Sequence, residues 1–398
     1  MKRKLLVLGL VLLSLSCQQA TRSRVEVKEA AELQGLVRGP YVSKVTKESA
    51  VVFFEVRPMQ PSPNLLVRWA SAGVVSEQRL GSEGLKHEVE LAGLGAGFTY
   101  RYEIIAESKD GAKTQTVLGN GAFTTPPDQP RQFRFVVYGD TRTQPQVHRQ
   151  VCEAIAGEQP AFVIHTGDLV SDGRNLKEWP EQFFGPAAPL LQVAAIYPAN
   201  GNHEAKSPLF YQYFGLPERK AWYSFTWGNV EVFVVDTEEE YEPDDEQGKW
   251  LAGQLSASKA TWKIAVHHVP GISSGSHGFN DGVNKHLRPL YERYGVDLVF
   301  SGHDHTYERT KPITGEGGDH AVTYVIAGGG GAPLYQLKTG PWTAAACSCH
   351  HYVVVEAGLD ALHLVTKDRD RQIIDTLTLR KDDPDYKKTA IAFDDLKK

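Results

Sequence analysis

FRFVVYGD, at residues 133–140, sets the pattern of the fold, because a short apolar run leads directly to an aspartate. A run of this length and composition is typical of a buried β-strand. The same arrangement, an apolar run followed by Asp, Asn or His, recurs in AFVIHTGD (161–168), VAAIYPANGNHE (193–204), WKIAVHHVP (262–270) and VDLVFSGHDH (296–305). The sequence therefore predicts five buried strands, each with polar groups just beyond its carboxyl end.

These polar groups are expected to meet at one site, because ligands bind at the carboxyl ends of the strands in an open α/β sheet. Carboxylate and amide oxygens mixed with neutral imidazoles suit Mn, Zn or Fe. Carboxylates that two cations can share suit a metal pair. The residues that follow the strands therefore predict a metal site.

The order of the five patches resembles the binuclear metallophosphoesterases, also called calcineurin-like phosphoesterases. That family carries D-x-H, G-D, G-N-H-E/D, H-x-P and G-H-x-H in this order. The purple acid phosphatase branch is the nearest, since GHDHTYER at residues 302–309 is similar to its G-H-x-H-x-Y-E-R signature. The resemblance extends over residues 35–380 and implies hydrolysis of phosphate esters, as monoesters or diesters, by a metal-bound hydroxide at a binuclear site.

The resemblance also implies two divalent or trivalent metal ions (Fe, Mn or Zn) with one carboxylate bridging them. A bridging carboxylate keeps two cations close despite their repulsion, and the pair activates water at neutral pH. The implied ligands are Asp140, Asp168 and His305 for the first metal position, and Asp168, Asn202, His268 and His303 for the second metal position.

Three histidine assignments follow from spacing within the family motifs. His268 is the expected ligand in place of His267, because it lies two residues before Pro270. His203 follows the Asn ligand and would contact the phosphate and help to protonate the leaving group. His277 lies nine residues past His268 and matches a second substrate-facing histidine of the purple acid phosphatases. An ordinary loop residue is the alternative for His277.

Two positions depart from the family pattern and weaken the first metal position. Arg142 stands where D-x-H has its histidine, and Ser171 stands where the purple enzymes have their metal-binding tyrosine. His148 and Asp172 are the candidates to fill in, with a surface role as the favoured reading of His148. Two roles stay open for Arg142: its guanidinium contacts substrate phosphate, or it forms a salt bridge with a loop carboxylate.

Residues 132–380 are predicted to form the catalytic domain, a layered α/β metallophosphoesterase sandwich flanked by helices. Strands alternate here with helical patterns at 146–156, 248–255 and 283–294, which argues for βαβ units. Later apolar segments are expected to be strands of a second sheet: 321–327, 352–356, 362–366 and 373–379. The charged tail, 381–398, is expected to fray.

Residues 35–126 are predicted to form a small all-β sandwich, because short strand patterns alternate with turn residues. The segment LGAGFTY at 94–100 resembles the L-x-P-G-T-x-Y turn of fibronectin type III domains, which precede the catalytic domain in purple acid phosphatases. The expected strands are 49–56, 65–69, 86–91, 100–106 and 114–118.

The N-terminus has the layout of a secretory signal peptide at residues 1–16, with three basic residues before an apolar stretch. That stretch ends next to Cys17, which resembles the lipidated cysteine of bacterial lipoproteins, and residues 17–34 would form a tether. We therefore expect export across the inner membrane and a lipoprotein of the cell envelope, periplasmic or outer-membrane. Secretion without a lipid is the alternative.

Composition limits the partners. The net charge of −5 and the absence of Lys/Arg tracts argue against nucleic-acid binding. The expected partners are a small phosphorylated substrate and, through the lipid, a membrane. Cys347 and Cys349 are one residue apart, and we expect incidental thiols there in place of a disulfide or a zinc site.

A metal-dependent phosphoesterase is the function that these residues favour. The alternative is a surface-anchored binding protein whose phosphoesterase domain is degenerate, which the two departures at the first metal position favour. Retention of the other ligands argues for the enzyme.

Replacing the predicted lipid anchor tests the envelope assignment. In Cys17→Ala the acceptor thiol is lost, so we expect the protein to leave the membrane fraction and appear in the soluble fraction. Membrane fractionation measures this directly, and unchanged membrane retention of the variant would refute the lipoprotein assignment.

Overall fold

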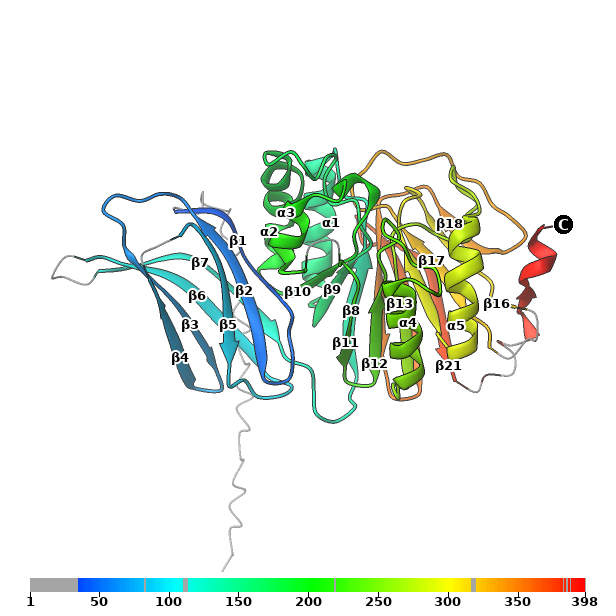
Figure 1. The fold of residues 1–398 in the computed structure, drawn as a ribbon, viewed down its shortest axis with the longest axis horizontal. Helices are drawn as coiled ribbons and strands as arrows, with labels where there is room; N and C mark the ends of the chain where they lie inside the picture. Colours follow the sequence, from blue (N-terminus) through cyan, green and yellow to red (C-terminus); the bar gives the residue numbers. More distant parts are fainter. Residues whose placement is uncertain are drawn as a thin grey trace, which may run out of the picture. The chain divides into compact units, whose positions relative to one another are not determined.

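The strands that carry the five polar patches all form, and they belong to two different sheets (Figure 1). The computed structural model describes residues 35–398 except 82–83, 110–113, 218–219, 316–319, 382, 384–385, 387 and 398. The predicted signal peptide (1–16), the tether (17–34) and the lipidated Cys17 lie outside the described residues.

The first catalytic sheet contains the first three patches and has the strand order β10-β9-β8-β19-β20-β21. Strands β8, β9 and β10 run parallel, so their carboxyl ends share one edge. Three late segments, predicted for a second sheet, instead extend this one, because β19 pairs antiparallel with β8. The strands are β8 (Phe133–Tyr138), β9 (Phe162–His165), β10 (Ala195–Pro198), β19 (His351–Ala357), β20 (Ala361–Asp368) and β21 (Ile373–Arg380).

The second catalytic sheet contains the last two patches and has the order β11-β12-β13-β14-β17-β15-β18. Its central strands β12, β13, β14 and β17 run parallel, which again brings carboxyl ends to one edge. The strands are β11 (Tyr223–Trp227), β12 (Val230–Val234), β13 (Trp262–Val266), β14 (Leu298–Ser301), β15 (Tyr307–Thr310), β17 (Thr323–Ala327) and β18 (Thr343–Cys347).

The two catalytic sheets face each other. The ring of Phe162 on β9 lies 4.8 Å from Trp227 and 5.3 Å from Phe225 on β11. At the carboxyl edge, the side-chain amide of Asn200 donates to Asp236 at 3.2 Å and so links the end of β10 to the end of β12. The contacts between the sheets therefore fix the distance between the loops at that edge.

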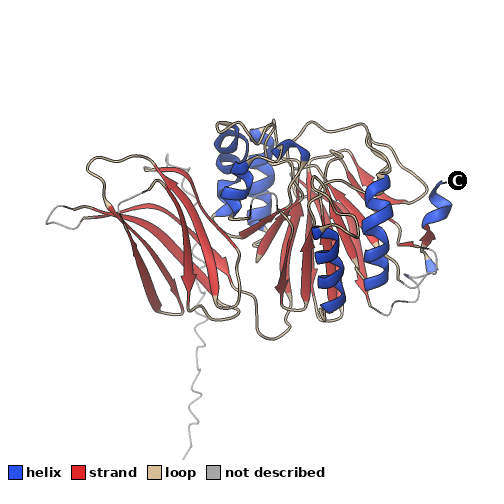
Figure 2. Ribbon diagram, viewed as in Figure 1, coloured by secondary structure: helices blue, strands red, loops and turns tan. Residues whose placement is uncertain are grey.

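Helices cover the outer face of each sheet, as predicted for a layered α/β domain (Figure 2). Val151, Cys152 and Ile155 are buried at helical spacing and pack in the core of the first sheet. Among the described residues, no helix has the length and apolarity needed to cross a membrane. The helices are α1 (Pro145–Gly157), η1 (Trp179–Phe184), α2 (Gly185–Leu191), η2 (Asn202–Glu204), α3 (Pro208–Phe214), α4 (Glu246–Ala257), η3 (Val283–Leu287) and α5 (Arg288–Tyr294).

The N-terminal region is all β, as predicted, with sheets in the orders β1-β2-β5 and β4-β3-β6-β7. Strands β1 and β4 were not among the expected strands; the β4 segment has no apolar alternation, and its Val74 and Val75 are both exposed. The resemblance to fibronectin type III domains stays a prediction. The strands are β1 (Leu36–Ser43), β2 (Ser49–Val56), β3 (Asn64–Ser71), β4 (Val74–Leu80), β5 (Lys86–Ala92), β6 (Thr99–Glu107) and β7 (Gln115–Thr124).

The C-terminal segment does not simply fray, which corrects the prediction for residues 381–398. Strand β22 (Ile391–Ala392) pairs with β16 (Ile313–Thr314), and helix η4 (Phe393–Lys397) follows. Phe393 and Leu396 are buried in the core of the second sheet. The tail is therefore docked by the apolar side chains of Phe393 and Leu396, with Ile391 packed against the same core.

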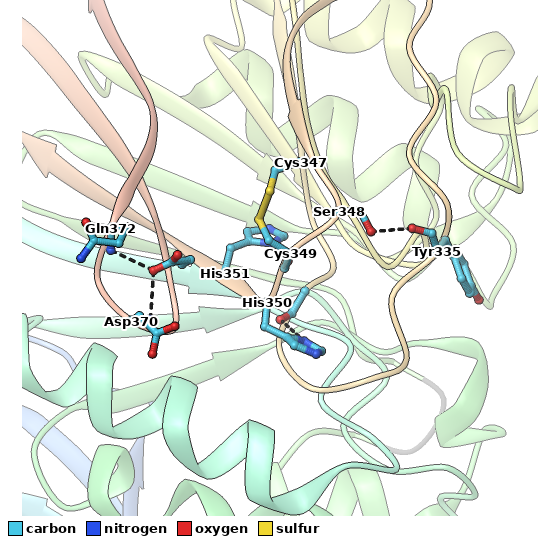
Figure 3. The surroundings of a disulfide bond; sticks show 10 residues. Tyr335, Cys347, Ser348, Cys349, His350, His351, Asp370 and Gln372 are labelled. Atoms are coloured by element: carbon cyan, nitrogen blue, oxygen red, sulfur yellow. Dashed lines mark hydrogen bonds between the residues drawn. A yellow bond between two sulfur atoms is a disulfide. The ribbon is translucent and has the colours of Figure 1, made fainter.

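Cys347 and Cys349 form a disulfide, so the prediction of incidental thiols is wrong (Figure 3). The chain turns back between β18 and β19, and this turn brings the two Cα atoms to 5.5 Å, within the range that a disulfide spans. His350 beside it is hydrogen-bonded through Nδ1 to the carbonyl of Gly329 at 3.2 Å. The disulfide therefore lies in a loop that contacts the glycine-rich segment 328–331.

Tyr41 on strand β1 packs in the hydrophobic core that covers the first catalytic sheet. Tyr41 is fully buried, and its ring lies 5.4 Å from Phe53 and 5.1 Å from Phe184. Its hydroxyl donates to the carbonyl of Tyr213 at 2.5 Å and accepts from Arg38 at 2.7 Å. Tyr41 therefore contributes packing and hydrogen bonds to the junction of the N-terminal β-region and the catalytic region, alongside contacts such as that of Ser43 with Ile196.

We expect Tyr41→Ala to lower the free energy of unfolding by about 3–5 kcal/mol, the usual cost of deleting a buried aromatic ring. Phe98→Ala is the matched control, because Phe98 is 48% exposed and should cost less than about 0.5 kcal/mol. Urea denaturation followed by fluorescence measures both. Equal effects of the two variants would contradict the role given to Tyr41.

Candidate metal centre

Asp140 and Asp168 follow β8 and β9 in tight turns that aim both carboxylates at the same edge. Both residues have left-handed backbones, with φ of 57° and 59°, a conformation that Asp tolerates better than most residues. The backbone N–H of Asp140 donates to the carbonyl of Gly167 at 3.0 Å, which holds the two turns side by side. Gly302 is required beside them, because a Cβ there would lie 2.3 Å from Asp140 Oδ2.

The second metal position is built around Nε2 of His268. This atom lies 3.3 Å from Asp168 Oδ1 and 3.0 Å from Asn202 Oδ1. Nδ1 of His303 lies 3.2 Å from His268 Nε2. His303 is in the loop that follows β14 of the second catalytic sheet. All four residues predicted for this position are thus brought together, from both catalytic sheets.

The donor chemistry of His268 fits a cation. Its Nδ1 lies 2.9 Å from the carbonyl of Thr166, so a neutral ring carries its proton there and Nε2 presents a lone pair. Burial lowers the pKa of His268 and keeps the ring neutral. A lone pair that faces the oxygens of Asp168 and Asn202 without a proton between them is the arrangement that a metal ion stabilises. Asp140, Asp168 and His268 also offer ligand atoms within 4.8 Å of one another.

His303 and His305 are also held neutral. Burial lowers the pKa of His303 to about 3 and that of His305 to about 4. Neutral imidazole is the form that binds metals. Asp140 behaves differently: burial and the neighbouring Asp168 raise its pKa, while the backbone N–H of His303 donates to both of its oxygens at 3.0 and 3.1 Å.

The first metal position is occupied by protein atoms. His305 presents Nε2 at 3.7 Å from Asp140 Oδ1, because its Nδ1 is 2.7 Å from the carbonyl of Pro333. Arg142 lies across this position: its Nε donates to Asp168 Oδ2 at 3.2 Å, and its Nη2 is 3.3 Å from His305 Nε2. The ligand set predicted here therefore does not fit a metal ion as it stands.

Neither candidate for a replacement ligand joins this position. His148 is fully buried beside Phe183, with Nδ1 2.9 Å from the carbonyl of Gln182, so its expected surface role is wrong. Asp172 pairs with Arg174 at 2.8 Å. Both side chains are engaged elsewhere: His148 on helix α1 contacts η1, and Asp172 pairs within its own loop.

His203 lies next to Asp168 with its imidazole partly exposed. Its backbone N–H donates to Asp168 Oδ1 at 3.0 Å, and its Nδ1 is 2.7 Å from the carbonyl of Ser171. The ring nitrogen Nε2 lies 3.8 Å from Asp168 Oδ2. A carbonyl only accepts, so Nδ1 carries a proton, and Nε2 is the atom available to a substrate.

His277 lies at the site and is not an isolated loop residue. Its ring centroid is 3.8 Å from that of His303, and its Nδ1 is 2.9 Å from Asp304 Oδ1. His267, in contrast, turns away from the site, with Nδ1 2.8 Å from the carbonyl of Val269 and its ring against Tyr291. This placement favours His268 as the ligand.

Three functional neighbours were missed from the sequence. Buried Asp304 also accepts from the backbone N–H of Ser276 at 2.9 Å and so holds the His277 loop. Buried Glu204 accepts from the backbone N–H groups of Asp168 (2.9 Å), Leu169 (2.8 Å) and Gly201 (2.8 Å). Glu204 lies inside the GNHE motif and Asp304 inside the GHDH motif. Their place in these motifs was the sequence signal that could have identified them.

The third missed residue is Tyr335, whose ring stacks on His305 with centroids 4.1 Å apart. It lies in the loop after the glycine-rich segment, and its backbone N–H donates to the carbonyl of His305 at 3.1 Å. Its carbonyl accepts from Ser348 in the disulfide loop at 2.7 Å (Figure 3). Tyr335 therefore lies between the disulfide loop and the first metal position.

Residues 133–307 match the family model described as Calcineurin-like phosphoesterase. A nucleotide pyrophosphatase/phosphodiesterase of Hordeum vulgare is 29% identical over 219 residues, which cover 45% of this chain and 59% of that protein. The probable inactive purple acid phosphatase 1 of Arabidopsis thaliana is 28% identical over 217 residues, which cover 44% of this chain and 35% of that protein. The chain thus spans less than two thirds of the length of these relatives.

A solved structure shares the fold. The purple acid phosphatase isolated from yellow lupin (Lupinus luteus) seeds superimposes with a TM-score of 0.75 at 20% identity, covering 87% of this chain and 75% of that one. The agreement extends beyond residues 133–307 and confirms the layered α/β architecture predicted from the five patches.

Proposed function

Because residues 133–307 match the calcineurin-like phosphoesterase model, we propose that the protein hydrolyses phosphate esters with a bound metal ion. The observation that carries this proposal is the convergence of Asp168, Asn202 and His303 on the lone pair of His268 Nε2. The proposal covers phosphomonoesters and phosphodiesters, with Fe, Mn or Zn as the metal.

The residues that would hold the ion are Asp168, Asn202, His268 and His303. When bound, such an ion supplies a Lewis acid and lowers the pKa of water. Asp168 is held in place for this role by the backbone N–H of His203 and by its own N–H bond to Glu204.

His203 is proposed as the proton donor to the leaving oxygen. The carbonyl of Ser171 fixes its Nδ1–H, so Nε2 must carry the transferred proton. Asp168 Oδ2 lies 3.8 Å from Nε2. His277 beside His303, and Arg142 beside Asp168, supply donors for the oxygens of a substrate phosphate.

A second function has support from Arg142. A guanidinium at the first metal position, and a relative that is called probably inactive, favour a surface-anchored binding protein with a degenerate phosphoesterase domain. The complete set of ligand residues at the second metal position argues for the enzyme, because a non-catalytic domain has no need for it. For either function, we propose an envelope location through Cys17.

Metal removal separates these functions. We expect the purified protein to contain Mn, Zn or Fe and to hydrolyse nitrophenyl phosphate esters. Chelation should abolish hydrolysis, and Mn²⁺ should restore it. Asp168→Ala should lose metal and activity together, whereas Asp172→Ala should keep both, because Asp172 pairs with Arg174 outside the site. Elemental analysis and rates on the same samples measure this, and a metal-free, inactive protein would favour the binding function.

His203→Ala separates proton transfer from metal binding. We expect the variant to keep its metal and to lose about 100-fold or more in turnover on alkyl phosphates, the usual scale of general acid catalysis. The loss should shrink for nitrophenyl esters, whose leaving group needs little protonation. Rates across a leaving-group series, with metal content measured in parallel, test this. A loss of metal, or an equal defect for good and poor leaving groups, would contradict the proton-donor role.

A further inference from the structure

We propose that Arg142 takes the place of the first metal ion, so that this chain works with a single metal ion at the second metal position. The inference rests on the proposed function and changes the metal count predicted from the family pattern. The guanidinium of Arg142 lies with Nε 3.2 Å from Asp168 Oδ2 and Nη2 3.3 Å from His305 Nε2.

The contacts of Arg142 use the electron pairs that a first ion would need. His305 Nε2 is an acceptor, because Nδ1 faces the carbonyl of Pro333, and the guanidinium N–H satisfies it. Asp168 Oδ2 is satisfied in the same way, while Oδ1 stays directed at His268. Of the three ligands expected at the first metal position, only Asp140 lacks a bond to Arg142 among the described contacts.

Charge supports the same conclusion. Guanidinium stays ionised at every pH at which proteins fold and presents only donors. The Arg142 side chain is 15% exposed and that of Asp168 is 1% exposed, so water screens little of the pair's interaction. A metal ion at this position would lie against a fixed positive charge, and its binding would require the ion pair to break.

The two departures from the family pattern are coupled through one acceptor. The side-chain carbonyl oxygen of Gln182 accepts from the backbone N–H of Thr143, next to Arg142, at 3.1 Å. The same oxygen accepts from the backbone N–H and the hydroxyl of Ser171 at 3.0 and 2.9 Å. The positions of the missing histidine and the missing tyrosine are therefore tied together, which indicates a rebuilt site and not a lost ligand.

Arg142 would then supply the charge of the first ion but not its water chemistry. It supplies a fixed positive charge and N–H donors where the family places an ion, so it neutralises Asp168 and faces a phosphate oxygen. It cannot activate water, because it has no open coordination position. The chemistry that requires a Lewis acid is left to the second metal position alone.

Counting bound Mn²⁺ tests this inference. Wild-type apoprotein should take up one equivalent by titration calorimetry and show the electron paramagnetic resonance spectrum of isolated Mn²⁺. Arg142→His, which restores D-x-H, should take up two equivalents and show an exchange-coupled pair. Arg149→His is the matched control, because Arg149 pairs with Glu153 on helix α1, and it should behave like the wild type.

The outcomes separate the two proposals. Two equivalents and a coupled spectrum in the wild-type protein, with hydrolysis intact, would overturn only the single-metal inference, and this holds even if Arg142→His fails to fold. One equivalent in both wild type and a folded Arg142→His would also overturn it, since Arg142 would not be what excludes the second ion. Absence of both Mn²⁺ binding and hydrolysis would overturn the proposed function as well.

Discussion

A single buried carboxylate, Asp168, constrains the rest of the site. Its oxygens meet the backbone N–H of His203, the imidazole of His268 and the guanidinium of Arg142. Burial raises the pKa of this carboxyl, whereas the backbone N–H of His203 and the guanidinium of Arg142 lower it. An ionised carboxylate away from water is costly unless every oxygen is paired. The loops after three different strands must therefore close around it in one arrangement.

That requirement explains why the two catalytic sheets are needed together. Asp168 and Asn202 come from the first sheet, and His268 and His303 come from the second. Neither sheet alone could present four ligand atoms around one point, because the loops of one edge lie in a row. The link between Asn200 and Asp236 fixes the distance between the two rows, so the packing of the sheets determines the geometry of the site.

The sequence predicted the strands and the residues that gather at the second metal position because both are local signals. Each ligand directly follows an apolar run, and the position of such a residue depends on its own strand. Strand order is not local: β19 joins β8 across more than two hundred residues, and no pattern in either segment specifies that pairing. Tyr335 was missed for the same reason, since it reaches His305 only through the folded course of the glycine-rich loop.

Arg142 changes the hydrogen-bonding character of a motif position. A histidine at this position would add a lone pair, whereas arginine adds N–H donors and a permanent charge. One substitution therefore reverses the character of the position from acceptor to donor. Ser171 follows the same logic: its hydroxyl donates to Gln182 where the family has a tyrosine oxygen for the metal. Two replacements that each exchange an acceptor for a donor, held by one glutamine, describe a site reorganised around a protein cation.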